Sequence, residues 1–353
     1  MKNSSFAYYR LPYAQEYFHL SQAGNPIRLD GYAQLGGVQG FVFAPFSIGN
    51  DCPLVVIEGR GLKKSPLPEE ATLRPLKSLR PLKSLASSGS SGSAYAVDFA
   101  NFHSRLTAGE FSKIVLARQE VLPVGIPCDE ASGRELFFQA CAHYPRMFIA
   151  LVSTPLTGMW LMATPEVLLE QSAEGFRTVA LAGTQHMGSG DWDEKQVAWN
   201  DKNIMEQRYV ATYITECLDQ LVGNMSADGP HTVRAGALAH LRTDFRFTLA
   251  DDSRMGDLIA ALHPTPAVCG LPKEAARRFI LQNESAPRRY YSGFTGPLGL
   301  GGETHLYVTL RCMELREGDC VLYAGGGLLP DSHLEQEWDE TVAKMETMRQ
   351  LIT

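Results

Sequence analysis

Residues 304–329, THLYVTLRCMELREGDCVLYAGGGLL, decide the fold class. Apolar and β-branched side chains dominate THLYVTLRCMEL (304–315) and CVLYAGGGLL (320–329), and Glu317-Gly318-Asp319 lies between the two runs. Two such runs joined by a short turn containing glycine predict an antiparallel hairpin. Helical periodicity at about 201–222 and 334–352 places this hairpin between two amphipathic helices, which indicates a mixed α/β fold.

Further strands are predicted on the N-terminal side of the hairpin. FSKIVLAR (111–118) has the composition of a buried strand, and GMWLMATPEVLLEQ (158–171) contains two apolar stretches broken at Thr164-Pro165-Glu166. Residues 1–60 contain short apolar runs separated by Gly, Asn and Pro, which predicts antiparallel strands. We divide the chain into a strand-rich part (1–94) and a region of alternating strands and helices (95–353), and these patterns alone allow one domain or two.

A low-complexity segment precedes residue 95. LRPLKS occurs twice in tandem over 73–84 and is followed by ASSGSSGS (86–93). Serine and glycine bury too little surface to order a chain, so we expect a flexible surface loop over 73–93.

Composition excludes several functional classes. The chain has 353 residues, 44% of them hydrophobic, and a formal net charge of −7, which disfavours a partner with a phosphate backbone. Seven scattered cysteines form no CxxC pair, as a reducing compartment permits. No signal peptide and no long apolar run are recognisable, so we expect a cytoplasmic protein without nucleic-acid or membrane partners.

Two charged residues lie in apolar patterns. Lys113 falls within the strand FSKIVLAR, and Glu206 falls within the apolar stripe of the helix that contains Tyr209 and Val210. A buried charge is costly unless it is paired or used, and desolvation lowers the pKa of a lysine enough for it to act as a base. A lysine that extends to water from the strand end is the alternative.

Carboxylates also line one flank of the C-terminal helix. Its predicted apolar stripe is Leu334, Trp338, Val342, Met345, Met348 and Ile352, and beside it lie Glu337, Glu340 and Lys344. Carboxylates on two helices, without His or Cys partners, suit magnesium rather than zinc, although a solvated Glu340/Lys344 pair is the simpler alternative.

Other candidates are less distinctive. Glu166, after Pro165, could be an acid with a raised pKa or a turn residue, and Arg311 could grip a carboxylate or form a salt bridge along the strand. Gly325-Gly326-Gly327 could let backbone N–H groups approach an anion, and His263 in HPTP is more often structural than catalytic.

The ordered motifs together resemble the chorismate-utilising enzymes, a family that includes isochorismate, salicylate, anthranilate and aminodeoxychorismate synthases. The motifs are FSKIVLAR, ATPEVLLE, LAGT, a helix with Lys202 and Glu206, LHPTPAVCGLPK, YYSGFTGPLG, YVTLR and YAGGGLLPDSHLEQEWDET with Lys344. The resemblance covers about residues 105–350. It implies one compact domain in which residues 95–353 are the chorismate-binding catalytic region. It also implies stacked, largely antiparallel sheets with helices outside, and two lobes around a deep active site.

The resemblance also implies residue roles. Lys113 is expected to be the base toward water, and Glu166 the acid toward the leaving hydroxyl at C4 of chorismate. The expected magnesium ligands are Glu206, Glu340 and, through water, Glu337. The expected substrate-binding residues are Gly183, Thr184, His263, Tyr291, Arg311, Gly325, Gly327 and Lys344.

Two positions indicate which family reaction to expect. The resemblance implies glutamine at the position of Lys113 in anthranilate synthases, and a nucleophilic lysine at the position of Ala182 in aminodeoxychorismate synthases. Lys113 with Ala182 therefore indicates isochorismate synthesis, with water as nucleophile and without a glutamine amidotransferase subunit. A salicylate synthase and a non-catalytic chorismate-binding subunit are the alternatives. Monomer and homodimer, and menaquinone and siderophore pathways, remain open.

One departure from the family pattern is expected to adjust activity. Gln207 stands where family members commonly have histidine after the metal-ligating glutamate. From like-charge repulsion between the carboxylates, we also expect that Glu206→Gln and Glu340→Gln leave the melting temperature unchanged or raised.

Overall fold

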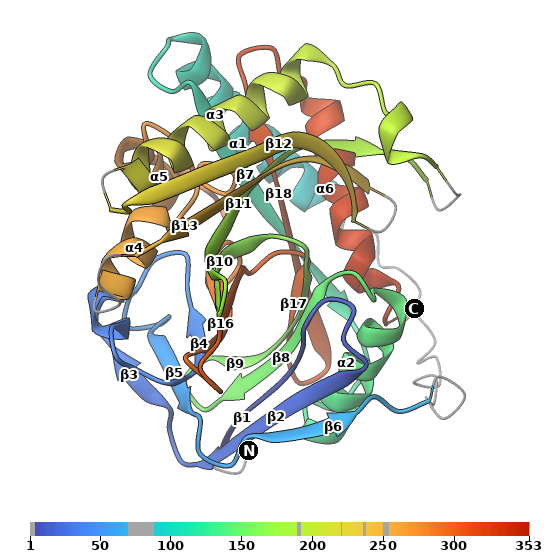
Figure 1. The fold of residues 1–353 in the computed structure, drawn as a ribbon. Helices are drawn as coiled ribbons and strands as arrows, with labels where there is room; N and C mark the ends of the chain where they lie inside the picture. Colours follow the sequence, from blue (N-terminus) through green and yellow to red (C-terminus); the bar gives the residue numbers. More distant parts are fainter. Residues whose placement is uncertain are drawn as a thin grey trace.

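Two nine-stranded antiparallel sheets, stacked face to face, form the centre of the computed structural model (Figure 1). The structure describes residues 4–69, 88–188, 192–219, 221–235, 238–249 and 254–352. The first sheet has the order β14 (Gly270–Leu271), β7 (Lys113–Pro123), β18 (Asp319–Leu328), β17 (Cys312–Leu315), β9 (Gly158–Thr164), β8 (Phe148–Thr154), β1 (Ser4–Arg10), β2 (Glu16–Ala23) and β6 (Lys63–Pro66). The second has the order β12 (Asn224–Ala235), β13 (Leu238–Thr248), β11 (Gly175–His186), β10 (Val167–Ser172), β16 (Thr304–Val308), β15 (Phe294–Leu298), β4 (Gly40–Ala44), β5 (Leu54–Glu58) and β3 (Ile27–Leu29).

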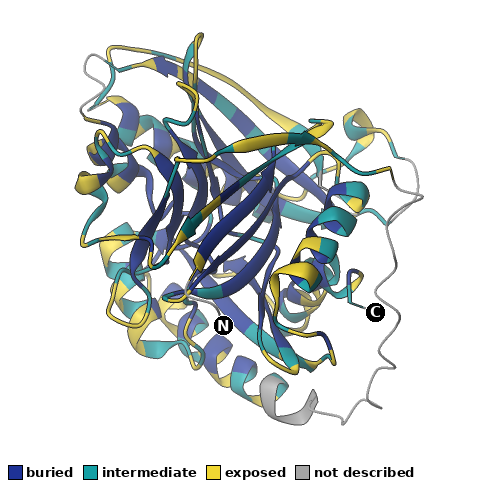
Figure 2. Ribbon diagram, turned by 90° about the horizontal axis from the view of Figure 1, so that it is seen from below, coloured by how far each residue is buried: buried dark blue, intermediate teal, exposed yellow. Residues whose placement is uncertain are grey.

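Helices cover the outer faces of both sheets. α3 (Asp201–Asp219) and α4 (Met255–Leu262) share a hydrophobic cluster with the second sheet, and α2 (Glu130–His143) and α6 (Leu334–Arg349) share one with the first. α1 (Ser88–Thr107) and α5 (Lys273–Asn283) pack beside β7 and β18. Figure 2 shows buried residues concentrated in the strands and exposed residues on the outer sides of the helices. The expected antiparallel sheets with helices outside are confirmed.

The N-terminal strands are divided between the two sheets. β1, β2 and β6 extend the first sheet, whereas β3, β4 and β5 extend the second. All of their pairings are antiparallel, as the alternation of apolar runs and turns predicted. Residues 4–66 therefore complete both layers of the fold.

The prediction of a flexible loop over 73–93 is wrong for its C-terminal end. Residues 73–87 lie outside the described residues, but 88–93 form the first turns of α1. Tyr95, Phe99, Phe102 and Leu106 recur at helical spacing and are buried against β7 and α5. Packing of this later stripe stabilises the helix and overrides the weak preference of the serine- and glycine-rich turns before it.

The predicted hairpin is confirmed only in its second half. β17 pairs with β18 across the turn at Gly318, which has a φ of 85° and so favours glycine. Residues 304–308, however, form β16 in the other sheet. Arg311, with a φ of 45°, lies at this change of sheet, so the apparently continuous run of 304–315 is two strands.

The buried side of α6 differs from the predicted apolar stripe. Val342 is 38% exposed, whereas Glu337 and Thr341 are 1% and 0% exposed. The helix lies over β18 with its carboxylates toward Gly326, so the polar flank and not the Val342 side faces the sheet. Periodicity located the helix correctly, and Met345 and Met348 of the predicted stripe are buried, but Val342 is exposed and the polar flank is buried beside the stripe.

The seven cysteines are all free. None of the helices within the described residues is both long and apolar enough to span a membrane.

Candidate active site

A cavity lies where α3, α6 and the ends of β7, β11, β13 and β18 meet. Its lining is Val115, Pro165, Glu166, Leu181, Ala182, Gly183, Thr184, Glu206, His240, Ala267, Val268, Tyr291, Leu310, Arg311, Tyr323, Ala324, Gly325, Gly327 and Lys344. Nine of the residues predicted from the sequence are in this set: Glu166, Gly183, Thr184, Glu206, Tyr291, Arg311, Gly325, Gly327 and Lys344.

A β-bulge shapes the wall formed by β11. The pairing register with β13 shifts between Ala182 and Thr184, and Gly183 between them has a φ of 73°. The Gly183 N–H donates to Glu206 Oε2 at 3.2 Å. A Cβ at Gly183 would lie 3.1 Å from the Asn203 carbonyl oxygen, so glycine relieves strain and lets α3 approach the strand closely.

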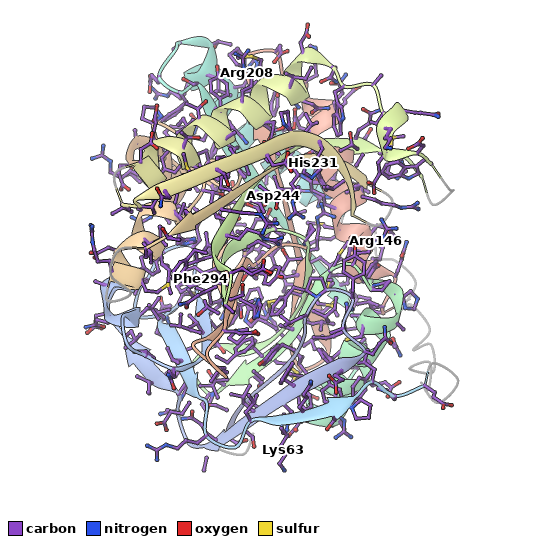
Figure 3. All side chains as sticks on the ribbon, viewed as in Figure 1. Lys63, Arg146, Arg208, His231, Asp244 and Phe294 are labelled. Carbon is purple, nitrogen blue, oxygen red and sulfur yellow. The ribbon has the colours of Figure 1, made fainter. Side chains whose placement is uncertain are left out.

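Helix α3 supplies the carboxylate at the centre of the cavity. Glu206 and Gln207 are buried, whereas Arg208 extends to the outside of the same helix (Figure 3). Gln207 Nε2 donates to the Ala180 carbonyl and to Thr243 Oγ1, both at 3.1 Å. The amide that replaces the usual histidine therefore holds α3 to the second sheet.

Lys113 is completely buried and forms an ion pair with Glu206. Its Nζ lies 2.9 Å from Glu206 Oε1, a charge contact that lacks the angle of a hydrogen bond. A Cβ at Gly327 would lie 2.2 Å from Glu206 Oε1 and 2.7 Å from Lys113 Cε, so only glycine leaves room for the pair. Burial opposes the charge of Glu206, but Lys113 and Lys202 lower its pKa below the ordinary range. Lys113 lies behind the Glu206 carboxylate and does not itself line the cavity.

Two further carboxylates lie behind the cavity, on α6. Glu337 accepts hydrogen bonds from Lys202 and from Ser332 Oγ, and Glu340 pairs with Lys344 at 2.6 Å. Burial and the charge of Glu340 raise the pKa of Glu337, whose Oε2 has no hydrogen-bond partner among the described residues.

These carboxylates fit a hard cation in their chemistry. A Cβ at Gly326 would meet Glu337 Oε2 at 3.0 Å and Glu340 Oε1 at 3.5 Å, while the adjacent Gly327 faces Glu206. Oxygen atoms from two helices thus flank one glycine pair, and one of them is an unpartnered buried oxygen. Within the described residues, no three acidic, His or Cys side chains form a ready-made metal centre, because each carboxylate is paired with a lysine.

Glu166 has the environment of a protonated acid. It is 3% exposed, and Thr265 Oγ1 donates to its Oε1 at 3.4 Å. Burial raises its pKa to about 7, although Lys113 opposes this increase. The carboxyl group can therefore hold a proton near neutral pH, as a general acid requires.

The raised pKa of Glu166 predicts a pH-dependent loss of stability. Its folded pKa exceeds the unfolded value of about 4.3, so the folded state loses stability as pH rises between these two values. We expect the free energy of unfolding of Glu166→Gln, relative to the unmodified protein, to grow by about 2 kcal/mol between pH 5 and pH 8. Urea denaturation at both pH values measures it, with exposed Glu174→Gln as the control. A pH-independent difference at Glu166 would contradict the prediction.

His240 is a site residue that sequence analysis missed. Its Nε2 accepts from Arg311 Nη2 at 2.9 Å, and its Nδ1 lies 3.0 Å from the Gly183 carbonyl oxygen. Burial and the charge of Arg311 lower the pKa of His240 well below its ordinary value, so the ring is neutral and donates to Gly183 through Nδ1–H. Arg311 keeps Nη1 without a partner among the described residues, available for an anion. A lone histidine in the strand LAHLRTDF gave no distinctive signal.

His263 does not line the cavity. Its ring packs edge-on against Tyr32 and Phe294, the latter labelled in Figure 3. Burial lowers its pKa to about 3. The expected substrate contact of His263 is therefore not found, because the loop carrying it turns the imidazole into the packing between α4 and β15 and presents Ala267 and Val268 instead.

Comparisons with known proteins show the family to which the chain belongs. A family model described as "Chorismate binding enzyme" matches residues 69–353. Relatives include the salicylate biosynthesis isochorismate synthase of Pseudomonas aeruginosa (31% identity, 71% of this chain and 52% of the relative), DhbC of Bacillus subtilis (32%, 69% and 64%) and MenF of Escherichia coli (32%, 70% and 57%), the latter two also isochorismate synthases. The matches thus span about half to two thirds of each relative.

Solved structures share the fold over nearly the whole chain. The menaquinone-specific isochorismate synthase MenF from Escherichia coli aligns with a TM-score of 0.77 at 22% identity, covering 100% of this chain and 89% of that one. Anthranilate synthase component I from Streptococcus pneumoniae aligns with a TM-score of 0.66 at 15% identity, covering 98% and 92%.

Proposed function

The chain belongs to the family of chorismate-binding enzymes, and from this membership we propose that it converts chorismate to isochorismate by adding water at C2. The observation that carries the proposal is a buried lysine behind the cavity, in contact with Glu206 of its wall, together with a buried carboxylic acid in that wall. Lys113 is 0% exposed, and Glu166 has a pKa of about 7. Addition of water and loss of hydroxide need one group that takes a proton and one that gives it.

The proposed anchor for the substrate is the cationic side of the cavity. Arg311 Nη1 has an unused donor, and Lys344 Nζ donates to the Gly325 carbonyl at 2.8 Å beside the cavity. Chorismate carries two carboxylates, which a guanidinium and an ammonium recognise well. Glycine at 325 also permits close packing of the cavity wall, because a Cβ there would lie 2.8 Å from the Leu116 carbonyl oxygen and 3.0 Å from the Tyr291 hydroxyl.

In the proposed mechanism, Lys113 deprotonates the water that attacks C2. Its ion pair with Glu206 has to open first, because the amine must leave the carboxylate to reach the attacking water. Glu166 protonates the hydroxide leaving C4 as the ring double bonds shift. Each proton transfer contributes about 10² to 10⁴ in rate.

We propose Glu206, Glu340 and Glu337 as the residues that hold magnesium. When bound, the ion would supply positive charge that neutralises a substrate carboxylate. The supporting observations are the three carboxylates around Gly326 and Gly327 and the unpartnered oxygen of Glu337.

Water rather than ammonia is the proposed nucleophile. Lys113 stands where the family resemblance implies glutamine in anthranilate synthases, and Ala182 stands where it implies a nucleophilic lysine in aminodeoxychorismate synthases. We propose a cytoplasmic monomer or homodimer whose only required partner is chorismate, without an amidotransferase subunit. Its product would enter menaquinone or siderophore synthesis.

Product analysis tests this function. Purified protein is incubated with chorismate and magnesium, with and without ammonium chloride, and the products are separated by chromatography. Isochorismate as the main product in both reactions is expected. Anthranilate or aminodeoxychorismate would refute water as nucleophile, whereas salicylate with stoichiometric pyruvate would identify a salicylate synthase.

A further inference from the structure

The outer edge of β7 has a partner strand for only two residues. β14 pairs Gly270 with Ile114 and Leu271 with Lys113, and the Val115 N–H still reaches the Cys269 carbonyl at 2.7 Å. Beyond this point, no strand among the described residues lies beside the carbonyl of Val115 and the N–H of Ala117. Both residues are buried, so unpaired backbone groups here would be costly.

A buried ion pair takes the place of the missing strand. Arg288 Nη2 donates to the Val115 carbonyl at 2.8 Å, and Glu284 Oε1 accepts from the Ala117 N–H at 2.8 Å. The two side chains also bind each other through Arg288 Nε and Glu284 Oε2 at 2.7 Å, and they are 2% and 4% exposed. The pair thus supplies one donor and one acceptor, as a neighbouring strand would.

Arg288 also contacts two other walls of the cavity, once through its guanidinium and once through its backbone carbonyl. Arg288 Nη1 donates to the Val268 carbonyl at 2.6 Å, and the Arg288 carbonyl accepts from the Tyr291 N–H at 2.9 Å. Val115, Val268 and Tyr291 all line the cavity. The ring of Phe46, 4.5 Å from the guanidinium carbon, covers one face of the group and limits its movement.

We propose that Glu284 and Arg288 are positioning residues that set the placement of Lys113 relative to the substrate, a proposal that rests on the proposed function. Lys113 lies two residues before Val115 and therefore on the same face of β7. A shift of the strand at Val115 would move the Lys113 amine together with the cavity wall. Neither Glu284 nor Arg288 lines the cavity, so they act through the backbone and not on the substrate.

Arg288→Lys tests the proposal, because lysine keeps the charge but not the planar set of donors that reaches two carbonyls at once. We expect kcat to fall by about 10- to 100-fold, since displacement by about 1 Å can cost 10²-fold, with KM changed by less than about threefold. Hydrogen exchange at the Ala117 amide should accelerate at least about tenfold. Glu284→Asp shortens the side chain that accepts from the Ala117 N–H, and we expect the same fall in kcat and the same faster exchange. This variant replaces Arg288→Lys in the test if Arg288→Lys does not fold.

Arg289→Lys is the matched control. Arg289 is the next residue and also pairs with a buried glutamate, Glu314, but it contacts no backbone group of β7. Its kcat, measured per folded molecule, and its Ala117 exchange should match those of the unmodified protein. Unchanged kcat per folded molecule in Arg288→Lys, or unchanged exchange at Ala117, would overturn the positioning role. An unmodified protein that does not convert chorismate would instead overturn the proposed function, and the positioning role with it.

Discussion

Lys113→Gln is expected to abolish isochorismate formation, because loss of a general base lowers kcat by about 10²- to 10⁴-fold. Glutamine is similar in length but cannot accept a proton near neutral pH. Chorismate binding should survive, because Arg311, Lys344 and the glycine backbone keep their positions in the cavity wall. Single-turnover kinetics and calorimetric titration with chorismate separate the loss of chemistry from the loss of binding.

Lys344→Gln provides the contrasting variant. Lys344 is also paired with a glutamate, but its Nζ lies at the cavity and donates to the Gly325 carbonyl. We expect this variant to raise KM more than it lowers kcat, because it removes a proposed anchor and leaves the base intact. Substantial isochorismate production by Lys113→Gln would exclude Lys113 as the base.

Glu206→Gln is expected to lower the melting temperature by several degrees and to weaken magnesium binding. Charge repulsion alone predicted an unchanged or raised melting temperature, but the structure shows that Glu206 is the partner of the fully buried Lys113. Removing one member of a buried pair costs about 3 to 5 kcal/mol, because the remaining charge is left uncompensated. Calorimetry, by thermal scan and by magnesium titration, measures both effects without reference to activity.

Glu340→Gln is the matched control for stability. Lys344 and Glu340 are 14% and 20% exposed, compared with 0% and 11% for Lys113 and Glu206, so we expect a smaller loss of stability than in Glu206→Gln. Magnesium binding should weaken in this variant as well. Equal melting temperatures for Glu206→Gln and the unmodified protein would show that Lys113 does not depend on Glu206 for its charge.

Sequence patterns predicted the strands and the charged residues that lie within them. Lys113 and Glu206 stood out because a charge in an apolar pattern is expensive, and both are buried in the structure. The resemblance to the family predicted nine of the residues that line the cavity, including Gly183 and Arg311. The charges in apolar patterns are local features that the residues alone reveal, whereas Gly183 was expected only because its motif resembles the family's.

Features that depend on long-range packing could not be predicted. The buried face of α6 contains Glu337 and not Val342, because the glycines of β18 have no side chains and the carboxylates of α6 can pack directly against them. His240 becomes a site residue only because β13 pairs with the bulged strand β11, which brings it to Gly183 and Arg311. The packing of His263 beside Tyr32 depends on a contact between residues far apart in the sequence.

The most direct test of the central claim is the origin of the oxygen at C2 of the product. The purified protein is incubated with chorismate and magnesium in water enriched in ¹⁸O, and the isochorismate formed is analysed by mass spectrometry. If Lys113 activates solvent water, each product molecule gains one ¹⁸O atom, located in the new hydroxyl group. Isochorismate without the label, or a product that carries an amino group at C2, would contradict the account.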